Sequence, residues 1–580
     1  MDAKLYLLTL SFLTFMFLAF FIFSKKKIQK IWPMLLGISP LIMIYALNSN
    51  LRIYSFHGFM HTGVVYQLLN GNIPPFNPVL GGQVMHYPWG WHCLAAFFTQ
   101  LLTITPFYSF ALINIVLLFF SMVLIYKISR LLIEDERANI FSVIVSLFAI
   151  SPMDLYLNFR LIRLLHIKLP LEIRGVPAFD KFSNINGVPV GLVFFLLFLY
   201  SIIKLFQQKR VGSNGVLFFI SVVGCGFFYP VMLPVIAAST VLVCSASVVI
   251  NKDRYLAYDL KKIIIVVGLG LTAMVMLMPY FFSITAGMKT SIQFFDPNNA
   301  SANILRYLVV TVPILLIIYI NRNFLKDKLN RTVIFILLSV IVASFSCYIF
   351  ISLPLESEYK YFMLSTVTLG ILGGTAFYAM NHGFKKIVVF ILLLLFLAPL
   401  YRNARWKSRF MNNVTDVSSL YAEKGRYLYS RNSEENELYQ WVRNHTDKNS
   451  IFIDSELTIP VLAQRQLFIG MDRESTSKPL PAAMKGTNGS PGYGFTIDTF
   501  LRRVYGYDSA LIDKRRAIVK SIYNPNQKLT DSEVETLFNA YENTYIVVRT
   551  KALEDKFRQG KLNQVFRSSK GHFILYQKES

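Results

Sequence analysis

The sequence predicts an all-α polytopic membrane domain followed by a soluble α/β domain. Hydrophobic residues make up 54% of its 580 residues, whereas charged residues make up only 16%. Apolar runs repeatedly reach or approach the roughly 20 residues that a helix needs to cross a bilayer. These runs stop at Tyr401, after which the composition becomes polar and mixed. The lipid bilayer is therefore the expected partner of residues 1–401, and residues 402–580 are the expected soluble domain.

Short clusters of Lys and Arg separate the apolar runs and predict the topology, because basic segments stay on the cytoplasmic side of a membrane. A first helix at 4–23 precedes the basic residues at 25–30, so residues 1–30 are expected to form an extra N-terminal span that runs inward. The further spans are expected at 31–48, 107–126, 139–151, 189–206, 215–229, 231–250, 263–281, 304–320, 332–351, 361–379 and 387–401. About twelve spans result, in a multi-pass protein of the plasma (inner) membrane whose C-terminal domain is extracytoplasmic.

Residues 91–105 are apolar, but they are short for a span and end at Pro106. If they crossed the membrane, the basic cluster at 127–137 would lie outside, against the positive-inside trend. We therefore expect a re-entrant or interfacial helix that belongs to an external loop, 49–106. A second external loop is expected at 152–188, within a membrane domain that covers 31–401.

The net charge of +25 does not predict nucleic-acid binding, because the Lys and Arg residues of the membrane domain lie mostly in the short clusters that determine topology. All four cysteines lie in or beside apolar segments and lack the spacing of metal ligands. They are expected to behave as small buried hydrophobic residues. Neither a disulfide framework nor a zinc site is indicated.

The first external loop is rich in polar and aromatic side chains. Four of the chain's eight histidines lie in it: His57, His61, His86 and His92. An amphipathic helix over 56–69 would place His57 and His61 one turn apart on the same face. Asn70 and Gly71 would end that helix, the prolines that follow would stiffen the turn, and a second helix would open after Trp89. An ordered loop of this kind at a membrane face is the expected place for function.

His57 and His61 are the leading catalytic candidates. Neutral imidazole can take a proton from a hydroxyl group or bind a divalent metal near neutral pH. Both roles stay open, with Mg²⁺ or Mn²⁺ as the candidate cofactors, beside a simpler role in bonding the loop backbone. Residues 36–100 contain no Asp or Glu. An acidic helper would therefore come from the second external loop, where Asp154 and Asp180 are the catalytic candidates.

The candidates for substrate binding are polar or aromatic residues that are expected at the external face. They are His86, Tyr87, Trp89, His92, Arg160, Arg163, Lys181, Asn184, Asn186, Glu358 and Lys360. Arg160, Arg163 and Lys181 run against the positive-inside trend, so they suit the phosphate of a lipid-linked substrate or the phosphates of ordinary lipids. Aromatic residues here either anchor the chain at the headgroup level or contact substrate. Glu358 and Lys360 form either a loop ion pair or a pair that binds sugar hydroxyls.

The C-terminal segment alternates helical and strand patterns. ENELYQWVRNHT predicts an amphipathic helix, and IFIDS, TYIVV and HFILYQ predict strands. LTIPVLAQRQLFIG predicts a short helix and a strand, and further helices are expected at 496–521 and 531–541. This alternation predicts a small α/β domain. The segment lacks a glycine-rich phosphate loop, an HExxH motif and a GxSxG motif, so we expect it to cover or support the membrane site.

The stretch HGFMHTGVVYQLLNGNIPPFNP…HYPWGWH resembles the first external loop of bacterial members of the GT-C class of integral-membrane glycosyltransferases. In that class a helix ending in Gly, an X-Pro-Pro turn, an Asn-Pro and a Tyr-Pro-X-Gly-X-His step recur. The segment ELYQWVRNHTDKNSIFID is similar to the start of the tail domain in these proteins. The resemblance covers most of the chain from about residue 31 onward. It departs at one point, because GT-C enzymes generally carry an acidic residue in this loop, where His57 and His61 stand here.

The resemblance implies a membrane glycosyltransferase that moves a sugar, a hexose or a pentose, on the extracytoplasmic face. The implied donor is a polyprenyl-phosphate-linked sugar, and the acceptor is a glycan, a lipid or a protein. The alternative is a non-catalytic protein, or one that transports or polymerises lipid-linked glycans. The external charges are expected at helix ends and loops rather than on broken helices at mid-membrane depth, which favours the enzyme over a transporter.

Overall fold

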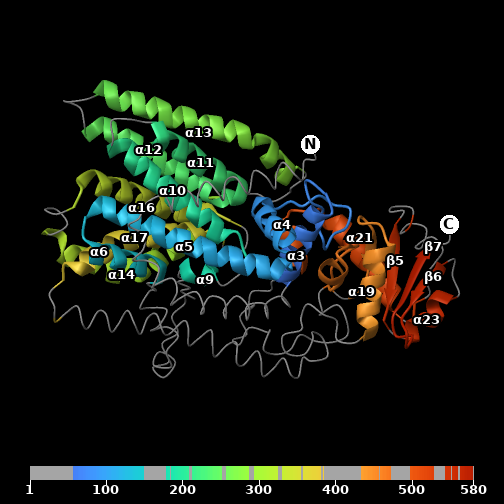
Figure 1. The fold of residues 1–580 in the computed structure, drawn as a ribbon. Coiled ribbons are helices and arrows are strands. Elements are labelled where there is room, and N and C mark those ends of the chain that lie inside the picture. Colours follow the sequence, from blue (N-terminus) through green and yellow to red (C-terminus); the bar gives the residue numbers. More distant parts are fainter. Residues whose placement is uncertain are drawn as a thin grey trace.

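The computed structural model describes the chain from Phe56 onward, with gaps. The described residues are 56–148, 178–182, 185–207, 212–250, 256–286, 293–323, 329–353, 357–380, 383, 433–455, 457–471, 497–524, 526–527, 538, 543–549, 551–558 and 562–578. Most of them are helical, and a small sheet lies near the C-terminus (Figure 1). The predicted spans at 4–23, 31–48 and 387–401 fall outside these ranges.

Six helical segments in the described ranges are long and apolar enough to cross a membrane. They are α5 (Pro106–Leu132), α10 (Val188–Gln207), α12 (Leu233–Ile250) with the preceding turn η3 (Pro230–Met232), α13 (Leu256–Thr285), α16 (Arg331–Phe350) and α17 (Tyr359–Tyr378). A seventh, α14 (Pro297–Ile320), bends by 51° between Val312 and Ile314. The residue between them is Pro313, and a proline inside a helix removes a backbone hydrogen bond and kinks it.

A helix occupies each predicted span from 107–126 to 361–379, with shifted ends. Two are shorter than membrane length: α6 (Glu136–Phe148) and α11 (Gly212–Phe228). The segment predicted to be re-entrant or interfacial forms α4 (Gly90–Leu102), which has 13 residues and is also too short to cross as a straight helix. The predicted total of about twelve spans stays a prediction.

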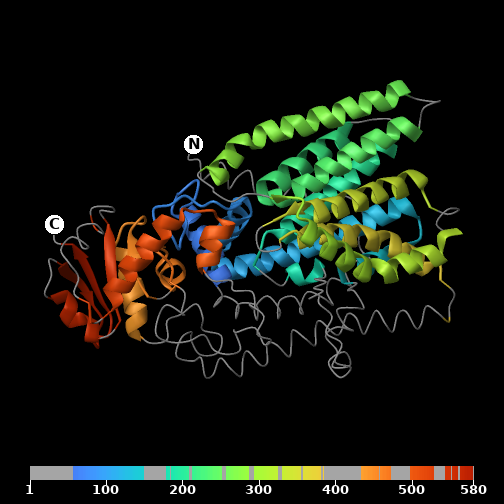
Figure 2. The ribbon, with the colours of Figure 1, turned by 180° about the vertical axis from the view of Figure 1, so that it is seen from behind.

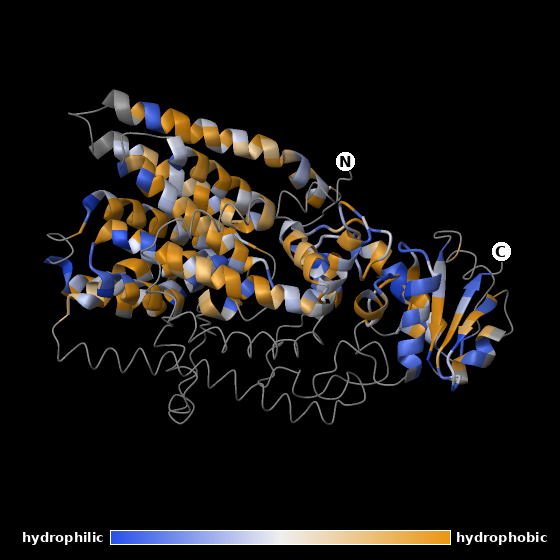
Figure 3. Cartoon of the chain, viewed as in Figure 1, coloured by the Kyte–Doolittle hydropathy of each residue, from blue (hydrophilic) through white to orange (hydrophobic). Residues whose placement is uncertain are grey.

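Helix α10 runs through the middle of the bundle, and α13 lies along one edge of it (Figures 1 and 2). In their most apolar windows, 89% of α10 is buried against other helices but only 22% of α13. Helix α13 is hydrophobic along most of its length (Figure 3). Its exposed apolar residues include Leu260, Ile264, Val267, Leu271, Met274, Val275, Met276, Met278 and Phe282. A surface of this kind is stable when it faces lipid, so α13 is expected to line the outside of the membrane domain.

Residues 433–578, which we call the tail domain, form a five-stranded sheet with the order β4-β3-β5-β7-β6. Strands β4 (Gln466–Leu467), β3 (Ile451–Ile453) and β5 (Thr544–Val548) are parallel, and β7 (Ile574–Lys578) and β6 (Leu562–Arg567) continue the sheet antiparallel. Its helices are α19 (Ser433–His445), α20 (Ile497–Thr499), α21 (Ser509–Tyr523) and α23 (Lys551–Arg558), with the short turns η6 (Ile459–Ala463) and η8 (Phe500–Val504). The strands predicted from IFIDS, TYIVV and HFILYQ are present as β3, β5 and β7. The sequence did not predict β6 or α23.

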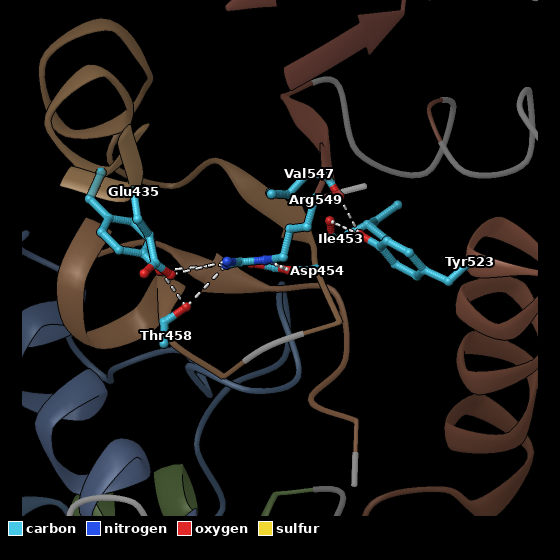
Figure 4. Close-up of polar contacts among 8 residues, drawn as sticks. Glu435, Ile453, Asp454, Thr458, Tyr523, Val547 and Arg549 are labelled. Atoms are coloured by element: carbon cyan, nitrogen blue, oxygen red, sulfur yellow. Dashed lines mark hydrogen bonds and ion pairs between the residues drawn. The ribbon is translucent and has the colours of Figure 1, made fainter. Parts of the chain in front are cut away.

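One buried ion pair holds the middle of the tail domain together (Figure 4). Arg549, which follows β5, places two guanidinium nitrogens 2.8 Å and 2.6 Å from the carboxylate oxygens of Asp454, which follows β3. The same guanidinium lies 3.0 Å from Glu435 of α19. A bidentate pair of this type has its hydrogen bonds satisfied. It therefore joins α19 to the carboxyl ends of two parallel strands.

Residues 78–81, in the loop predicted to be external, are bound to the open edge of this sheet. The amide of Leu467 in β4 donates to Pro78 O (2.9 Å), and the amide of Gly81 donates back to Leu467 O (2.7 Å). Arg515 of α21, only 3% exposed, donates to Gly81 O (2.8 Å) and to Phe468 O (2.7 Å). Backbone and side-chain hydrogen bonds thus tie the loop to the edge of the sheet. It occupies the region between the helical bundle and the tail domain in both views (Figures 1 and 2).

Candidate functional site

The histidine-bearing helix α3 spans Phe56–Leu69, as predicted, but the expectation that it is amphipathic was wrong. Residues 60–65 are buried, as are Gly58, Gln67 and Leu68. The cause is its position, because α3 packs against α4, against α5 and against the turn η6 of the tail domain. A helix that is covered on all sides needs apolar residues all round. His61, with no exposed surface, consequently points into the protein rather than into water.

His61 forms a hydrogen-bonded pair with His92 of α4. The two rings are joined by His61 Nδ1 and His92 Nε2, which lie 2.8 Å apart, and both side chains are fully buried. The other nitrogen of His92, Nδ1, lies 3.3 Å from Trp89 O. Because a carbonyl oxygen can only accept, neutral His92 carries its proton on Nδ1 and its lone pair on Nε2. His61 Nδ1–H therefore donates to His92.

This pairing assigns the lone pair of neutral His61 to Nε2. A second imidazole then fixes the tautomer and the ring orientation of the first, the role that an orienting group plays toward a general base. When His61 accepts a proton at Nε2, the resulting imidazolium keeps its hydrogen bond to His92. The pair can thus hold a proton in a place closed to bulk water.

Tyr87 connects the histidine pair to a second group of polar residues. Its ring centroid lies 5.7 Å from that of His61 and 6.3 Å from that of His92. Burial raises the pKa of Tyr87, and the nearby phenol of Tyr359 raises it further. Tyr87 therefore stays a neutral hydroxyl group at any ordinary pH, able to donate one hydrogen bond and to accept others.

The second group surrounds the start of α17. Lys181 of α9 (Ala178–Phe182) donates from Nζ to the hydroxyl of Tyr359 at 2.8 Å, with Nζ 4.2 Å from the centre of that ring. Lys360 Nζ lies 5.4 Å from the ring of Tyr229. Glu358, which is 3% exposed, accepts from the amide of Leu353 at 3.3 Å. Two cations and two phenols thus lie together beside Tyr87.

Asn186 has a structural task at this point. Its Oδ1 accepts from Val188 N (2.9 Å), and its Nδ2 donates to Lys181 O (3.0 Å). The side chain thereby fixes α9 against the first turn of α10. It thereby helps to position Lys181.

Two candidates of the first loop lie at its contacts with neighbouring elements. His86 stacks on Tyr507 of the tail domain, with ring centroids 4.5 Å apart, and its Nδ1 lies 3.1 Å from Tyr505 O. Burial lowers the pKa of His86, although the carbonyl of Tyr505 counteracts this, so the ring is neutral near pH 7. Trp89 packs edge-on against Tyr280 of α13, 5.2 Å away between ring centroids. Both residues hold the loop in place.

The other predicted site residues lie wholly or partly outside what the structure describes. Asp154, Arg160, Arg163 and Asn184 are in the undescribed ranges. The backbones of His57 and Asp180 belong to α3 and α9, but their side chains are not described. The structure therefore brings together His61, Tyr87, His92, Lys181, Glu358 and Lys360. It leaves the roles of the other residues as predictions.

Among the described residues, no three His, Cys, Asp or Glu side chains are close enough to share a metal ion. The 2.8 Å between His61 Nδ1 and His92 Nε2 is a hydrogen-bond distance. Two nitrogens bound to one ion at about 2.0–2.1 Å each would be farther apart. These two nitrogens are consequently hydrogen-bonded to each other.

Sequence reasoning named Tyr87 but missed the other tyrosines of the site. Tyr359 lies next to Lys360 in LPLESEYKYF, a loop that drew notice only for its charges. Tyr359 was more informative than the charged residues, since its phenol can contact both Lys181 and Lys360, which come from different loops. Tyr505 offers no comparable signal, because nothing in RRVYGYDS links it to a loop more than 400 residues earlier.

No protein-family model matches this chain, and no curated protein matches it. Two solved structures of ArnT from Cupriavidus metallidurans are similar over most of its length. The structure bound to undecaprenyl phosphate is 12% identical, covers 94% of this chain and 97% of its own, and has a TM-score of 0.47. The apo structure is 10% identical, covers 94% and 98%, and has a TM-score of 0.45. At such values the roles of residues must be argued from the site itself.

Proposed function

We propose that this protein is a membrane glycosyltransferase that moves a sugar from a polyprenyl-phosphate-linked donor to an acceptor on the extracytoplasmic face. The observation that carries the proposal is that the buried histidine pair lies close to the group formed by Lys181 and Tyr359. The buried His61–His92 pair adjoins Tyr87, and Tyr87 adjoins Tyr359 with its bound Lys181. The proposed proton acceptor and the proposed phosphate-binding lysine are thus neighbours, as transfer from a sugar phosphate requires. The donor class rests on the GT-C resemblance of the first loop.

In the proposed mechanism, Lys181 and Lys360 hold the phosphate of the donor. Ammonium groups bind phosphate as point charges and stabilise the charge that collects there as the sugar leaves. The acceptor oxygen bonds to the anomeric carbon on the face opposite the phosphate, which inverts the configuration. The bond from that carbon to the phosphate oxygen breaks, and its electron pair stays on the polyprenyl phosphate. His61 Nε2 takes the proton of the acceptor hydroxyl.

Residues of the predicted second external loop, 152–188, also have roles in this proposal. Arg160 and Arg163 would add bidentate contacts to the donor phosphate, and Asp154 and Asp180 are the proposed acidic helpers. Asp180 immediately precedes Lys181 in α9, so its backbone lies next to the residue that we propose for phosphate binding. A metal ion is not needed for the step described, since His61 removes the proton and the cations neutralise the phosphate.

Mass spectrometry of lipid-linked saccharides and envelope glycans from a strain that lacks the gene tests the function. The proposal expects one sugar addition to be lost from an envelope glycan, lipid or protein, with its lipid-linked donor accumulating unused. Complete saccharides that accumulate on the inner face would instead establish the transport alternative. An unchanged glycan profile would contradict both.

Lys181→Met is expected to weaken the binding of decaprenyl phosphate by roughly 10-fold or more, because it removes one charge-assisted hydrogen-bond donor while keeping the aliphatic stem. Binding can be measured by titrating the lipid into the purified full-length protein in detergent. Lys262→Met is the matched control. Lys262 is buried, and it donates to Phe206 O at the other end of α10. Equal affinities for the two variants would remove Lys181 from the phosphate site.

A further inference from the structure

Tyr505 of the tail domain is a buried phenol whose hydroxyl has no hydrogen-bond partner in the described ranges. Its side chain has no exposed surface. Burial raises the pKa of Tyr505 well above its ordinary value, and the phenols of Tyr87 and Tyr507 raise it further. The hydroxyl is consequently a permanent neutral donor. A donor kept dry without a partner destabilises a fold and calls for an explanation.

The residue is held rigidly at the contact between the two domains. Its amide donates to Phe500 O (2.9 Å), and its carbonyl accepts from His86 Nδ1 (3.1 Å). Two residues on, the hydroxyl of Tyr507 donates to Val84 O (2.6 Å) and accepts from Asn77 Nδ2 (3.1 Å). Bonds on both sides thus fix the backbone of Tyr505. Its unpaired hydroxyl is not the result of a loose chain.

Its surroundings point to the substrate site. The ring of Tyr505 meets that of Tyr87 edge-on, 5.7 Å away between centroids. Tyr87 in turn lies against His61 and beside Tyr359, the partner of Lys181. The indole Nε1–H of Trp91, which meets the His61 ring edge-on at 4.9 Å, is a second buried donor without a partner among the described residues. Of these two unused donors, Trp91 lies against the proposed base, and Tyr505 lies against Tyr87, which contacts that base.

We propose that Tyr505 donates a hydrogen bond to a hydroxyl of the donor's sugar, so that the tail domain supplies part of the substrate site. The assignment of Tyr505 to the sugar rests on the order of these residues in space. Lys181 and Tyr359 stand at the proposed phosphate position, Tyr87 follows, and Tyr505 lies beyond it, where the group attached to the phosphate must be. A sugar offers many hydroxyl acceptors, and its C–H faces pack on aromatic rings. This inference rests on the proposed function.

Tyr505→Phe and Tyr507→Phe form a matched pair, since each deletes one buried hydroxyl from the same turn. Tyr505→Phe should leave the melting temperature of the full-length protein unchanged or raise it, because the lost hydroxyl had no partner in the fold. Tyr507→Phe should lower it, because Val84 O and Asn77 Nδ2 lose their partner. If Tyr505→Phe lowers the melting temperature as much as Tyr507→Phe does, its hydroxyl is structural and the inference is wrong.

Binding tests the sugar contact directly. The probes are decaprenyl phosphate and the same lipid carrying one hexose or one pentose, titrated into the detergent-solubilised protein. Tyr505→Phe should weaken binding of the matching sugar lipid by roughly 2- to 10-fold, the size of one hydrogen bond, and leave decaprenyl phosphate unaffected. A wild-type preference for a sugar lipid that survives in Tyr505→Phe overturns this inference alone. If the wild type binds no sugar lipid better than the bare lipid, the proposed donor fails as well.

Discussion

His61→Ala is expected to reduce sugar transfer by roughly 100-fold or more, the usual effect of losing a general acid–base group. The reason is geometric. The hydrogen bond from His61 Nδ1 to His92 Nε2 assigns the basic lone pair to His61 Nε2, and no other imidazole in the described ranges is placed to replace it. The measurement is the transfer rate of purified protein with its lipid-linked donor. His445→Ala, at an exposed histidine of α19, should keep the wild-type rate.

A second variant separates chemistry from folding. Alanine leaves buried His92 without its partner, which could unfold the site. Asparagine places an amide N–H near the position of Nδ1 and keeps that bond, but it has no basic nitrogen. His61→Asn should therefore remain as stable as the wild type and still lose transfer. Full activity of His61→Asn would remove the histidine from the chemistry, leaving Asp154, Asp180 and Glu358 as the acid–base candidates. Loss of wild-type activity in chelator, with rescue by Mn²⁺ or Mg²⁺, would instead assign the histidine loop to metal binding.

Much of the membrane domain could be predicted because lipid imposes a simple rule on the sequence. An apolar run between basic clusters must be a helix, since only a helix satisfies its own backbone in a bilayer. The observed helix ends differ from the predicted ones, because hydropathy does not determine where a helix stops. Helix α5 was expected to stop at 126 but continues to Leu132, because Tyr126 and Lys127 belong to a helical stretch that outlasts the apolar one. Hydropathy predicts where the segment leaves the membrane, but the helix continues beyond that point.

Only some residues of the candidate site could be identified from the sequence, for a different reason. His61 and His92 could be named because they lie in one loop of distinctive composition. Tyr359 and Tyr505 join the site through the tertiary fold, from α17 and from the tail domain. The burial of α3 escaped prediction for the same reason. Its covering element η6 lies about 400 residues later, and a periodicity argument contains no information about it.

Gly90→Ala is expected to be the most damaging small substitution in the site region. Gly90 begins α4, and a Cβ added there would lie 2.2 Å from Phe227 O and 2.9 Å from Phe227 C in α11. Backbone atoms of a packed helix cannot yield as a flexible side chain can, so α4 itself must move away from α11. Overpacking of this kind typically costs about 1–3 kcal/mol of folding free energy. The melting temperature should fall clearly.

The same displacement should act on catalysis, because His92 lies only two residues after Gly90 on the first turn of α4. Moving that turn lengthens the 2.8 Å bond between His92 and His61 and releases the orientation of the base, so transfer should drop by roughly 10-fold or more. Gly212→Ala is the matched control. Gly212 also begins a helix, α11, but a Cβ there meets nothing within 4 Å, and alanine at an unstrained position stabilises by about 0.4–1 kcal/mol. A Gly90→Ala protein with the melting temperature and activity of Gly212→Ala would show that the contact between α4 and α11 does not position the histidine pair.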